Sequence, residues 1–378
     1  MTVTIIGTLP PITGISLSCL EQLRALSQLA KIRFINFKAI YPKLLYRWTL
    51  NEKLDLNINR RSVEILSIIS WYNPWSWIKA GLLIKGKICH IHYWNFYLFL
   101  PLFTIMLVAK IRKKKIVCTL HNIFGHESNI FDRLLTKILL YLPEKFIVHS
   151  KHNKISAIKC LGIKKKNINV IPLGIASIYA NKQVSKIKAR EKLGLDKDIK
   201  IVLFFGSIRK YKGIDVLIKA FLKVLIKVKN VKLAIVGEAW ANWQIYDKLI
   251  DKLLLNKSLI KKIEFIPTNE VKYYFSAADI LVLPYLKFEA QTAIGMIGLA
   301  FAKPMIVTKV GGLPDLVKDD RTIVEPGNIN QLSKTIQVVL TEKKLLKKLE
   351  NDSKTLAKKF SWKKIAFKTI KIYKELLK

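Results

Sequence analysis

Short apolar runs alternate with segments of helical periodicity along the first part of the chain. The apolar runs cover residues 3–9, 31–37, 87–95, 115–122 and 145–152, and most of them end in polar residues. Between the first two runs, residues 17–30 have the pattern of an amphipathic helix. Strands that are separated by helices predict a parallel sheet joined by right-handed crossovers.

The same alternation begins again near residue 200. The second set of apolar runs covers 199–207, 231–238, 262–267, 279–285 and 303–312. The sequence therefore predicts the α/β class, with two doubly wound, Rossmann-like parallel-sheet domains. We place the first domain at residues 1–175, a linker at 176–197 and the second domain at 198–360. Ligands of such sheets bind beyond the carboxyl ends of the strands, so we expect the candidate residues at a central cleft between the domains.

Length and composition agree with a folded protein of two domains. The chain has 378 residues, of which 51% are hydrophobic, and it can bury two cores of ordinary size. The four cysteines stand far apart without a C-x-x-C pair, which predicts neither a disulfide framework nor a zinc site and favours a reducing cytoplasm. They are Cys19, Cys89, Cys118 and Cys160.

Two segments bear on targeting and membrane insertion. The opening segment, MTVTIIGTLPPITG, lacks the basic region and the long apolar run of a signal peptide. Residues 96–109 are uncharged, but they are few for a membrane span and contain Pro101. We interpret residues 96–109 as a buried helix.

The chain is strongly basic. It contains 66 Lys and Arg against 26 Asp and Glu, which gives a formal net charge of +40. Such an excess favours polyanionic partners, which are nucleic acid, an anionic membrane or a phosphorylated substrate. A coding bias that enriches lysine and isoleucine together is an alternative explanation, so charge by itself does not select the partner.

Cations and glycines gather where one apolar run passes into a helix, in the segment FFGSIRKYKGIDVLIKAF at residues 204–221. The loop contains Gly206, Arg209, Lys210, Lys212 and Gly213. The start of the following helix would offer unpaired N–H groups and the positive end of the helix dipole. An arginine can bind two phosphate oxygens at once. We interpret the loop as a diphosphate site, with a solvated basic loop as the alternative.

A second motif covers residues 284–317, PYLKFEAQTAIGMIGLAFAKPMIVTKVGGLPDLV. It resembles the C-terminal signature of glycosyltransferase family 4, the retaining sugar-nucleotide transferases of the GT-B fold. The positions that match the signature are Glu289, Lys303, Pro304, Gly311, Gly312, Pro314 and Asp315. Other segments follow the order of the family along nearly the whole chain, at 10–16, 170–175, 273–285 and 360–377.

The resemblance implies the GT-B fold, with a nucleotide-sugar donor as substrate, no cofactor, and a final helix at 361–378 that packs back toward the first domain. It implies that Arg209 and Lys212 bind the donor diphosphate and stabilise the leaving nucleotide without a metal. Glu289 would accept hydrogen bonds from hydroxyls of the donor sugar. The other donor-binding residues that it implies are Gly206, Ser207, Gly213, Gln291, Thr292 and Gly312.

The first domain is expected to hold the acceptor. His121 ends a predicted strand where the family often has a histidine, which implies that it positions the donor sugar or the acceptor. A core or surface histidine is the alternative. Gly14 and His92 are expected to line the acceptor side of the cleft. His90 and His92 lie two apart on one strand, but without a third ligand they do not predict a metal site.

Two departures from the family pattern concern the donor site. Ser207 follows Gly206, so the nearest arginine stands three residues beyond the glycine. Ile297 occupies the position of the family's second carboxylate, eight residues after Glu289. Isoleucine cannot accept hydrogen bonds from a ribose. Either the ribose is held differently, or the chain is a catalytically weakened relative that only binds.

An aromatic and basic segment at residues 70–87 combines Trp71, Trp75, Trp77, Lys79, Lys85 and Lys87, and a basic run follows at 112–115. Tryptophan and lysine together are typical of a membrane interface. We therefore expect the first domain to bind an anionic membrane surface peripherally, with a packed surface helix as the alternative. Binding of nucleic acid is not expected, because the lysines are spread over all helices and no recognition module is present.

From these residues and the resemblance we expect a retaining, metal-independent hexosyltransferase that moves a sugar from a nucleotide-sugar to a saccharide or lipid-linked acceptor. The setting implied by the resemblance is synthesis of cell-surface polysaccharide or glycolipid at the inner face of the cytoplasmic membrane. The alternatives are the binding-only relative and, least favoured, a basic nucleic-acid-binding protein.

Overall fold

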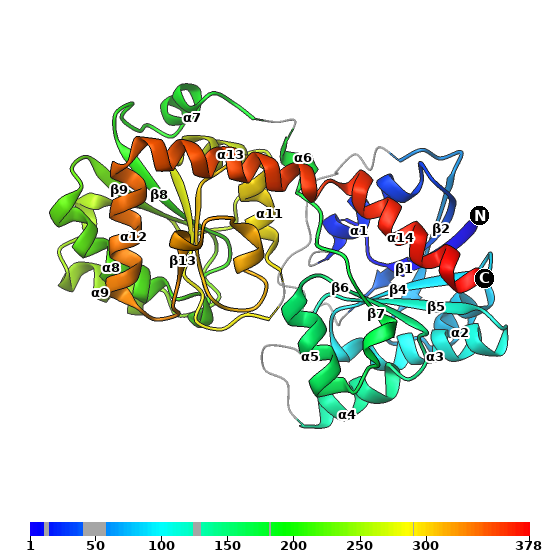
Figure 1. Cartoon of the computed structure of the whole chain (residues 1–378). Coiled ribbons are helices and arrows are strands. Elements are labelled where there is room, and N and C mark those ends of the chain that lie inside the picture. The colour runs from blue at the N-terminus through cyan, green and yellow to red at the C-terminus, as the bar shows by residue number, and fades with distance from the viewer. Residues whose placement is uncertain (11–14, 41–57, 124–129, 181–182, 290) are drawn as a thin grey trace. The chain divides into compact units, whose positions relative to one another are not determined.

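The chain folds into two compact units. The computed structural model describes residues 1–10, 15–40, 58–123, 130–180, 183–289 and 291–378. Unit 1 consists of Met1–Gly174 and Phe360–Lys378, and unit 2 consists of Ile175–Lys359. Both are α/β units built on a parallel sheet, and each is described by itself (Figure 1).

Unit 1 contains a seven-stranded parallel sheet in the order β3-β2-β1-β4-β5-β6-β7. Its strands are β1 (Thr2–Gly7), β2 (Lys31–Ala39), β3 (Val63–Ser70), β4 (Ile88–Tyr93), β5 (Lys115–Leu120), β6 (Lys145–Val148) and β7 (Ile168–Val170). The strand order changes direction between β1 and β4. This is the switch point of a doubly wound sheet, beyond whose strand ends ligands bind.

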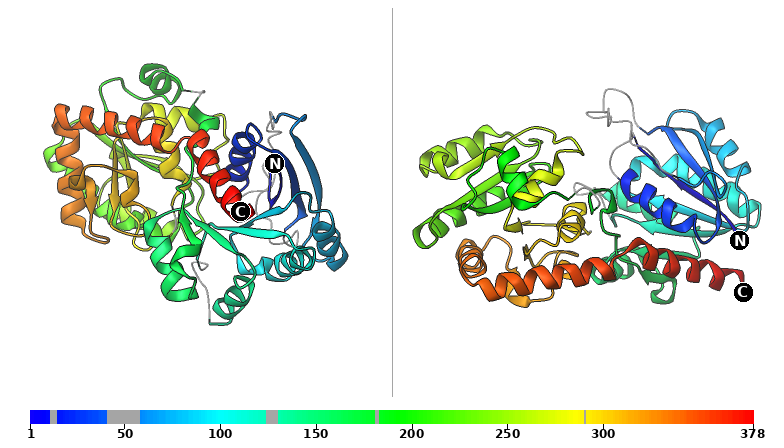
Figure 2. Two further views of the ribbon diagram at one scale, coloured as in Figure 1. Left: turned by 45° about the vertical axis from the view of Figure 1, so that its right-hand side comes forward. Right: turned by 90° about the horizontal axis from the view of Figure 1, so that it is seen from above.

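Helices cover both faces of this sheet (Figure 2). Two of them, α1 (Ser16–Leu26) and α14 (Trp362–Leu377), share one core with the sheet. The opposite core includes side chains of α2 (Pro74–Leu82), α3 (Phe99–Ile111) and α5 (Lys151–Leu161). Further helices in the described part of the unit are α4 (Ile130–Leu139), η2 (Phe96–Leu98) and η3 (Lys165–Asn167).

The apolar stretch at 96–109 forms η2 and most of α3, as interpreted from the sequence. Leu102, Ile105 and Met106 face the core, whereas Leu100 and Leu107 on the same helix are exposed. Across the described ranges, every helix is too short or too polar to span a membrane.

Unit 2 contains a six-stranded parallel sheet in the order β10-β9-β8-β11-β12-β13. Its strands are β8 (Lys200–Phe205), β9 (Val231–Val236), β10 (Leu259–Lys262), β11 (Ile280–Leu283), β12 (Met305–Thr308) and β13 (Ile323–Val324). Its α-helices are α6 (Ser177–Ala180), α7 (Lys186–Lys192), α8 (Ile214–Lys227), α9 (Gln244–Lys252), α10 (Val271–Ala277), α11 (Ala293–Ala300), α12 (Ile329–Thr341) and α13 (Lys343–Lys359). Short 3-10 helices are η4 (Lys210–Lys212), η5 (Asn256–Ser258), η6 (Pro314–Leu316) and η7 (Asp320–Thr322).

The stretch that we expected as a linker, 176–197, contains α6 and α7 and belongs to unit 2. The buried Arg190 on α7 fixes it there, because its Nη2 donates to Asp279 Oδ2 at 3.0 Å. Asp279 also accepts the backbone N–H of Ile201 at 2.7 Å. One carboxylate therefore joins α7 to the start of β8.

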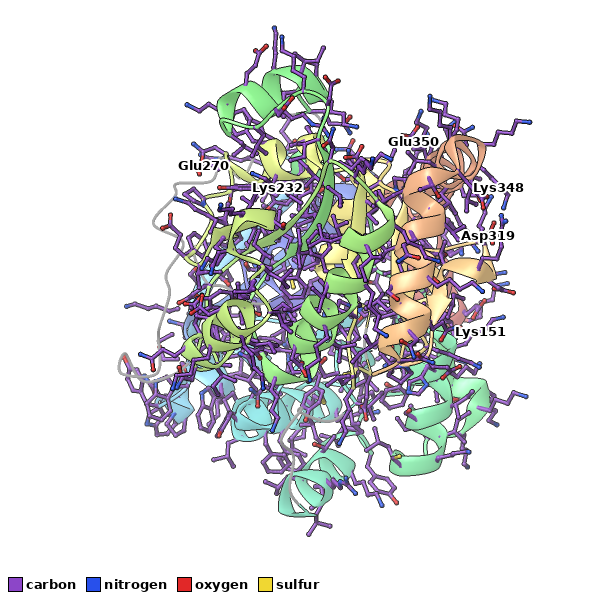
Figure 3. The ribbon with its side chains drawn as sticks, turned by 90° about the vertical axis from the view of Figure 1, so that its left-hand side faces the viewer. Lys151, Lys232, Glu270, Asp319, Lys348 and Glu350 are labelled. Atoms are coloured by element: carbon purple, nitrogen blue, oxygen red, sulfur yellow. The ribbon has the colours of Figure 1, made fainter. Side chains whose placement is uncertain are left out.

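Helix α13 is anchored to unit 2 by a second buried carboxylate. Asp319 accepts hydrogen bonds from Arg321 Nη2 at 2.7 Å and from Lys348 Nζ at 2.6 Å. Figure 3 shows Asp319 and Lys348 close together, with Lys348 on the helix. The hydrogen bonds from the Arg321 guanidinium and the Lys348 ammonium hold the pKa of Asp319 well below its usual range.

Candidate functional site

The basic loop of unit 2, residues 206–213, connects β8 to α8 and is bounded by two glycines with positive φ. Gly206 has φ 109° and Gly213, the N-cap of α8, has φ 66°. A Cβ atom on Gly213 would lie 2.1 Å from the carbonyl oxygen of Pro284. The loop is therefore pressed against the end of β11, and only glycine fits at this position.

Lys212 places its ammonium inside this loop. The residue is only 6% exposed, its Nζ donates to Ser207 Oγ at 3.1 Å, and Nζ lies 5.5 Å from the centre of the Tyr285 ring. Burial, with a smaller effect of the Arg209 charge, lowers the pKa of Lys212 to about 7. Lys210, the third cation of the loop, is exposed.

Arg209 is held by an aromatic ring from the next loop. Its guanidinium carbon lies 4.2 Å from the centre of the Trp240 ring, a cation–π arrangement. Trp240 Nε1 donates to Glu238 Oε2 at 3.0 Å. Trp240 was not among the predicted site residues, although an aromatic residue shortly after a predicted strand was an available signal.

Within the described parts of unit 2, neither Arg209 nor Lys212 forms an ion pair with a carboxylate. Buried charges in proteins are normally paired. These two neighbouring cations therefore lack a compensating negative charge among the described residues. Both residues were predicted as donor-diphosphate ligands, and that role stays a prediction.

The structure brings the second predicted motif against this loop. The backbone N–H of Leu286 donates to the carbonyl oxygen of Tyr211 at 2.7 Å, and the rings of Tyr211 and Phe288 stack. A Cβ atom on Gly206 would lie 3.1 Å from Ile294 Cδ1, in the first turn of α11. Residues 206–213 and 286–294 are therefore neighbours in space.

The predicted sugar-binding residues lie at the start of α11. Glu289 is half-buried, and Gln291 and Thr292 are buried. Thr292 is the N-cap, since its Oγ1 accepts the N–H of Ile294 at 3.2 Å. These three polar residues thus come directly after residues 286–288, which contact the basic loop.

The glycine pair of the motif is also close to this segment. Gly311 has φ 52°, and a Cβ atom on it would lie 2.4 Å from the carbonyl oxygen of Phe288. The position that requires glycine here is therefore Gly311, whereas the sequence pointed to its buried neighbour Gly312. The role of Gly312 toward the donor stays a prediction.

Two other motif positions serve the core. Ile297 is 6% exposed on α11, a helix without a single charged residue, so the second-carboxylate position lies in an apolar environment. Lys303 Nζ donates to the carbonyl oxygens of Ser276 and Ala278, at the end of α10. Burial lowers the pKa of Lys303 to about 8. Its contacts are those of a helix cap.

Unit 1 contains four buried histidines on or directly after its central strands, which are His90, His92, His121 and His149. Three of them, His92, His121 and His149, form a hydrogen-bonded histidine row. His92 Nδ1 lies 2.9 Å from His121 Nε2, and His121 Nδ1 lies 3.2 Å from His149 Nε2. His149 Nδ1 lies 3.0 Å from the carbonyl oxygen of Ile171. The sequence identified His121 and His92 as candidates but missed His149, which follows a predicted strand as His121 does.

His90 belongs to a separate hydrogen-bond group. Its Nδ1 lies 2.5 Å from the hydroxyl of Tyr373 on α14, and its Nε2 lies 2.7 Å from Thr119 Oγ1. In the described ranges, no three His, Cys, Asp or Glu side chains are arranged to hold a metal ion. The predicted acceptor residue Gly14 lies outside the described residues.

The tryptophans of the aromatic segment in unit 1 lie partly on the surface and partly in the core. Trp75 on α2 is 77% exposed and Trp71 is partly exposed. Trp77 is buried and donates its Nε1–H to the carbonyl oxygen of Ser70 at 2.7 Å. The inclusion of Trp77 in a membrane-facing set was therefore wrong, because its position on α2 points it to the core.

Part of the predicted basic run has a structural role. Arg112 Nη1 donates to the carbonyl oxygens of Gly81 and Leu82 at the end of α2, and Lys114 Nζ donates to that of Gly86. These two cations bind backbone carbonyl groups. We had expected them to face lipid.

Comparison with known proteins identifies relatives in sequence. Residues 185–356 match the model of a family described as glycosyl transferases group 1. A lipopolysaccharide 1,2-N-acetylglucosaminetransferase of Salmonella typhimurium is 22% identical over 89% of this chain and 81% of its own length. Two glycosyltransferases of Methanocaldococcus jannaschii are 28% and 30% identical over 50% and 47% of this chain. The matches span about half the length of these two relatives, 48% and 49%.

Solved structures share the whole fold. A sucrose-phosphate synthase from Thermosynechococcus elongatus has a TM-score of 0.77 at 16% identity, covering 100% of this chain and 99% of its own. HepE of Anabaena, in complex with UDP and glucose, has a TM-score of 0.76 at 17% identity, covering 99% and 100%. The predicted GT-B fold, with two Rossmann-like parallel-sheet domains, is confirmed.

Proposed function

From the match of residues 185–356 to the glycosyl transferases group 1, we propose that this chain transfers a hexose from a nucleotide-sugar donor to a saccharide or lipid-linked acceptor. The reaction is proposed to retain configuration and to need no metal. The setting is the synthesis of cell-surface polysaccharide or glycolipid.

One observation carries the donor part of the proposal. The cations of Arg209 and Lys212 lie in one loop, between two glycines with positive φ, and have no carboxylate partner in the described part of the chain. A diphosphate supplies the missing negative charge, and backbone N–H groups at the start of α8 add the positive end of the helix dipole. The HepE structures contain UDP and UDP-glucose, which makes uridine nucleotides the first donors to test.

The chemical role of these residues follows from where charge develops. As the bond between sugar and phosphate breaks, negative charge grows on the departing diphosphate. A fixed guanidinium and ammonium beside it lower the barrier if they contact it better in the transition state than in the ground state. Glu289, Gln291 and Thr292 are proposed to orient the sugar through its hydroxyls. We assign no protein nucleophile.

The experiment is a thermal-shift panel of ADP-, GDP-, UDP- and TDP-sugars. Binding to the folded protein raises its melting temperature by mass action, so one nucleotide class should stabilise the wild type. Arg209→Ala removes a charge-assisted hydrogen bond and should weaken that nucleotide about 10- to 150-fold. Lys210→Ala, the exposed cation of the same loop, is the matched control and should bind as the wild type does. Equal loss in both variants would sink the proposal.

The buried Ile297 favours a second candidate, a relative that binds donors without transferring sugar. The ribose hydroxyls then lack the acceptor that a carboxylate provides. Nucleotide release from the best-stabilising donor distinguishes the two. Release that Arg209→Ala abolishes supports the transferase, whereas tight binding without release under any condition supports the binding protein.

For the acceptor, we propose that unit 1 approaches an anionic membrane surface, at the inner face of the cytoplasmic membrane. Helices α2 and α3 pack against each other and expose large apolar side chains. These are Trp75, Leu82, Leu100, Leu107 and Ile111. Lys79 on α2 is exposed beside them. Exposed apolar groups interspersed with cations suit anionic headgroups and favour a lipid-linked acceptor.

A further inference from the structure

The histidine row of unit 1 has a fixed direction of hydrogen bonding. The carbonyl oxygen of Ile171 can only accept, so the Nδ1 of His149 carries the proton of that bond. The Nε2 of a neutral His149 then accepts from His121 Nδ1–H. By the same step, His121 Nε2 accepts from His92 Nδ1–H. One carbonyl group thereby determines the tautomer of three imidazoles.

All three rings are neutral at physiological pH. Burial lowers the pKa of His92, His121 and His149, and the neighbouring imidazoles lower those of His92 and His121 further. The last atom of the row, His92 Nε2, therefore holds a lone pair and no proton. It is buried and has no hydrogen-bond partner among the residues that the structure describes. Both nitrogens of His121, in contrast, are occupied by its neighbours.

His92 lines a small cavity that lies wholly in unit 1. The cavity has a volume of about 10 Å³, and Gln22, His149, Leu173, Trp362 and Ile365 line it with His92. Gln22 on α1 is also buried, and its Oε1 has no partner in the described part of the chain. A volume of this size holds one water-sized group, such as a single hydroxyl. Both residues that carry these buried acceptors line the cavity, and the acceptors require a group that donates hydrogen bonds.

We propose that this cavity is a hydroxyl-binding subsite, in which His92 Nε2 accepts the hydrogen bond of a saccharide hydroxyl. His121 and His149 are positioning residues, because they hold His92 in the tautomer that can accept. That the hydroxyl belongs to a sugar rests on the proposed function. The contact to the ligand thus moves from His121, which the resemblance implied, to His92. The subsite selects hydrogen-bond donors and excludes groups that only accept.

The first test reads the ring nitrogens of the wild-type protein directly. Protein labelled with ¹⁵N in its histidine rings is studied by NMR, with methanol as the smallest hydroxyl probe and acetonitrile as a probe of similar size that cannot donate. We expect an unprotonated His92 Nε2 whose resonance shifts with methanol and not with acetonitrile. A protonated Nε2 contradicts the proposal. So does a resonance that no hydroxyl probe changes, which would indicate an unpartnered core histidine or a permanent water.

A pair of variants tests the positioning role. In His149→Phe, the Nδ1–H of His121 loses its acceptor, so His121 and then His92 are free to change tautomer. The methanol response of His92 should be lost although His92 itself is intact. His152→Phe, at an exposed histidine in the first turn of α5, is the control and should keep the response. Retention of the wild-type response in folded His149→Phe overturns the relay.

Two further probes identify the source of the hydroxyl. Methyl glycosides stand for an acceptor saccharide, and UDP-glucose stands for the donor sugar. The probe that shifts His92 Nε2 names the source, and failure of both overturns a sugar ligand. The thermal-shift panel reads the donor loop of unit 2 independently. A methyl glycoside response without any nucleotide stabilisation would therefore reject the proposed donor chemistry while keeping the subsite.

Discussion

The ammonium of Lys212 donates a hydrogen bond to the hydroxyl of Ser207 across 3.1 Å, in surroundings that leave the lysine almost fully buried. A neutral hydroxyl compensates only part of the cost of removing a charge from water. The unliganded loop therefore holds a cation that is more stable when an anion is present. The stability of the empty protein and the proposed binding of a diphosphate thus make opposite demands on one residue.

Lys212→Met should show this opposition. Methionine keeps the volume and removes the charge, so the melting temperature of the unliganded variant should rise. The affinity for UDP or a UDP-sugar, obtained from the shift in melting temperature, should fall at least tenfold. Lys210→Met, on the exposed side of the loop, should change neither quantity. A lower melting temperature in unliganded Lys212→Met would show that the ammonium stabilises the fold.

Affinity for UDP should depend on pH through the same group. The folded protein releases the Lys212 proton near pH 7, whereas the unfolded chain keeps it up to about 10.5. Because the pKa of Lys212 is lower in the folded state, its contribution to the free energy of unfolding of the unliganded protein rises between pH 7 and 10.5. A bound diphosphate favours the charged form of Lys212, so Lys212 takes up a proton when the ligand binds above pH 7. Affinity should therefore fall as the pH rises, by at most about tenfold per unit.

Titration calorimetry in two buffers of different ionisation enthalpy measures this proton uptake. At pH 8 the wild type should take up a proton from the buffer on binding UDP. Lys212→Met has no group to protonate and should show the same heat in both buffers. Proton uptake that persists in the variant would assign the effect to another residue.

Trp240 should contribute to binding through Arg209. In Trp240→Leu the guanidinium loses the aromatic face that holds it, and UDP should bind about two- to five-fold more weakly. Trp243→Leu is a suitable control, because that ring contacts Tyr246 on the following helix. Isothermal titration of both variants makes the comparison. Equal affinities would mean that Arg209 needs no support from Trp240.

Alanine substitutions at Gly213 and Gly194 test how closely the basic loop contacts the end of β11. Their φ angles are 66° and 65°, but a Cβ atom meets the carbonyl of Pro284 at 2.1 Å on Gly213 and nothing within 4 Å on Gly194. Gly194→Ala should cost about 1 kcal/mol for the left-handed backbone. Gly213→Ala should cost clearly more, because α8 has to move away from β11. Urea unfolding compares the two, and equal costs would contradict the close contact.

The surface of α2 and α3 should bind anionic vesicles. Trp75→Ser with Leu100→Ser removes two exposed apolar side chains and should reduce co-sedimentation with vesicles that contain phosphatidylglycerol. Leu254→Ser, at a leucine of unit 2 that is 90% exposed, should leave it unchanged. Binding that is insensitive to the anionic lipid content would reject the membrane proposal.

The sequence predicted the elements that repeat a clear pattern. Buried strands such as β1, β5, β8 and β9 are continuous apolar runs, so both sheets were expected. The strands β3, β7 and β13 were not anticipated. Each lies at an edge of its sheet, and β7 and β13 are very short, while β3 is partly exposed. An edge strand needs less apolar surface and leaves a weaker signal.

The candidate site was predictable where its residues follow one another in the chain. Arg209 and Lys212 are near neighbours in sequence, and their loop was found from composition alone. Trp240 and His149 act through contacts between separate strand ends, which a single sequence does not specify. The buried environment of Ile297 likewise depends on how α11 packs, and its residue type alone did not determine it.

Unit 1 is assembled from two stretches of chain with the whole of unit 2 between them. On the ribosome, the sheet and α1 emerge long before α14, and the synthesis of unit 2 separates them by roughly 10 to 40 s. During this interval the apolar surface that Ile370 and Tyr373 later cover is bare, and the Nδ1 of His90 lacks the Tyr373 hydroxyl. The nascent first unit is therefore a candidate for chaperone binding, while unit 2 can fold as soon as it emerges.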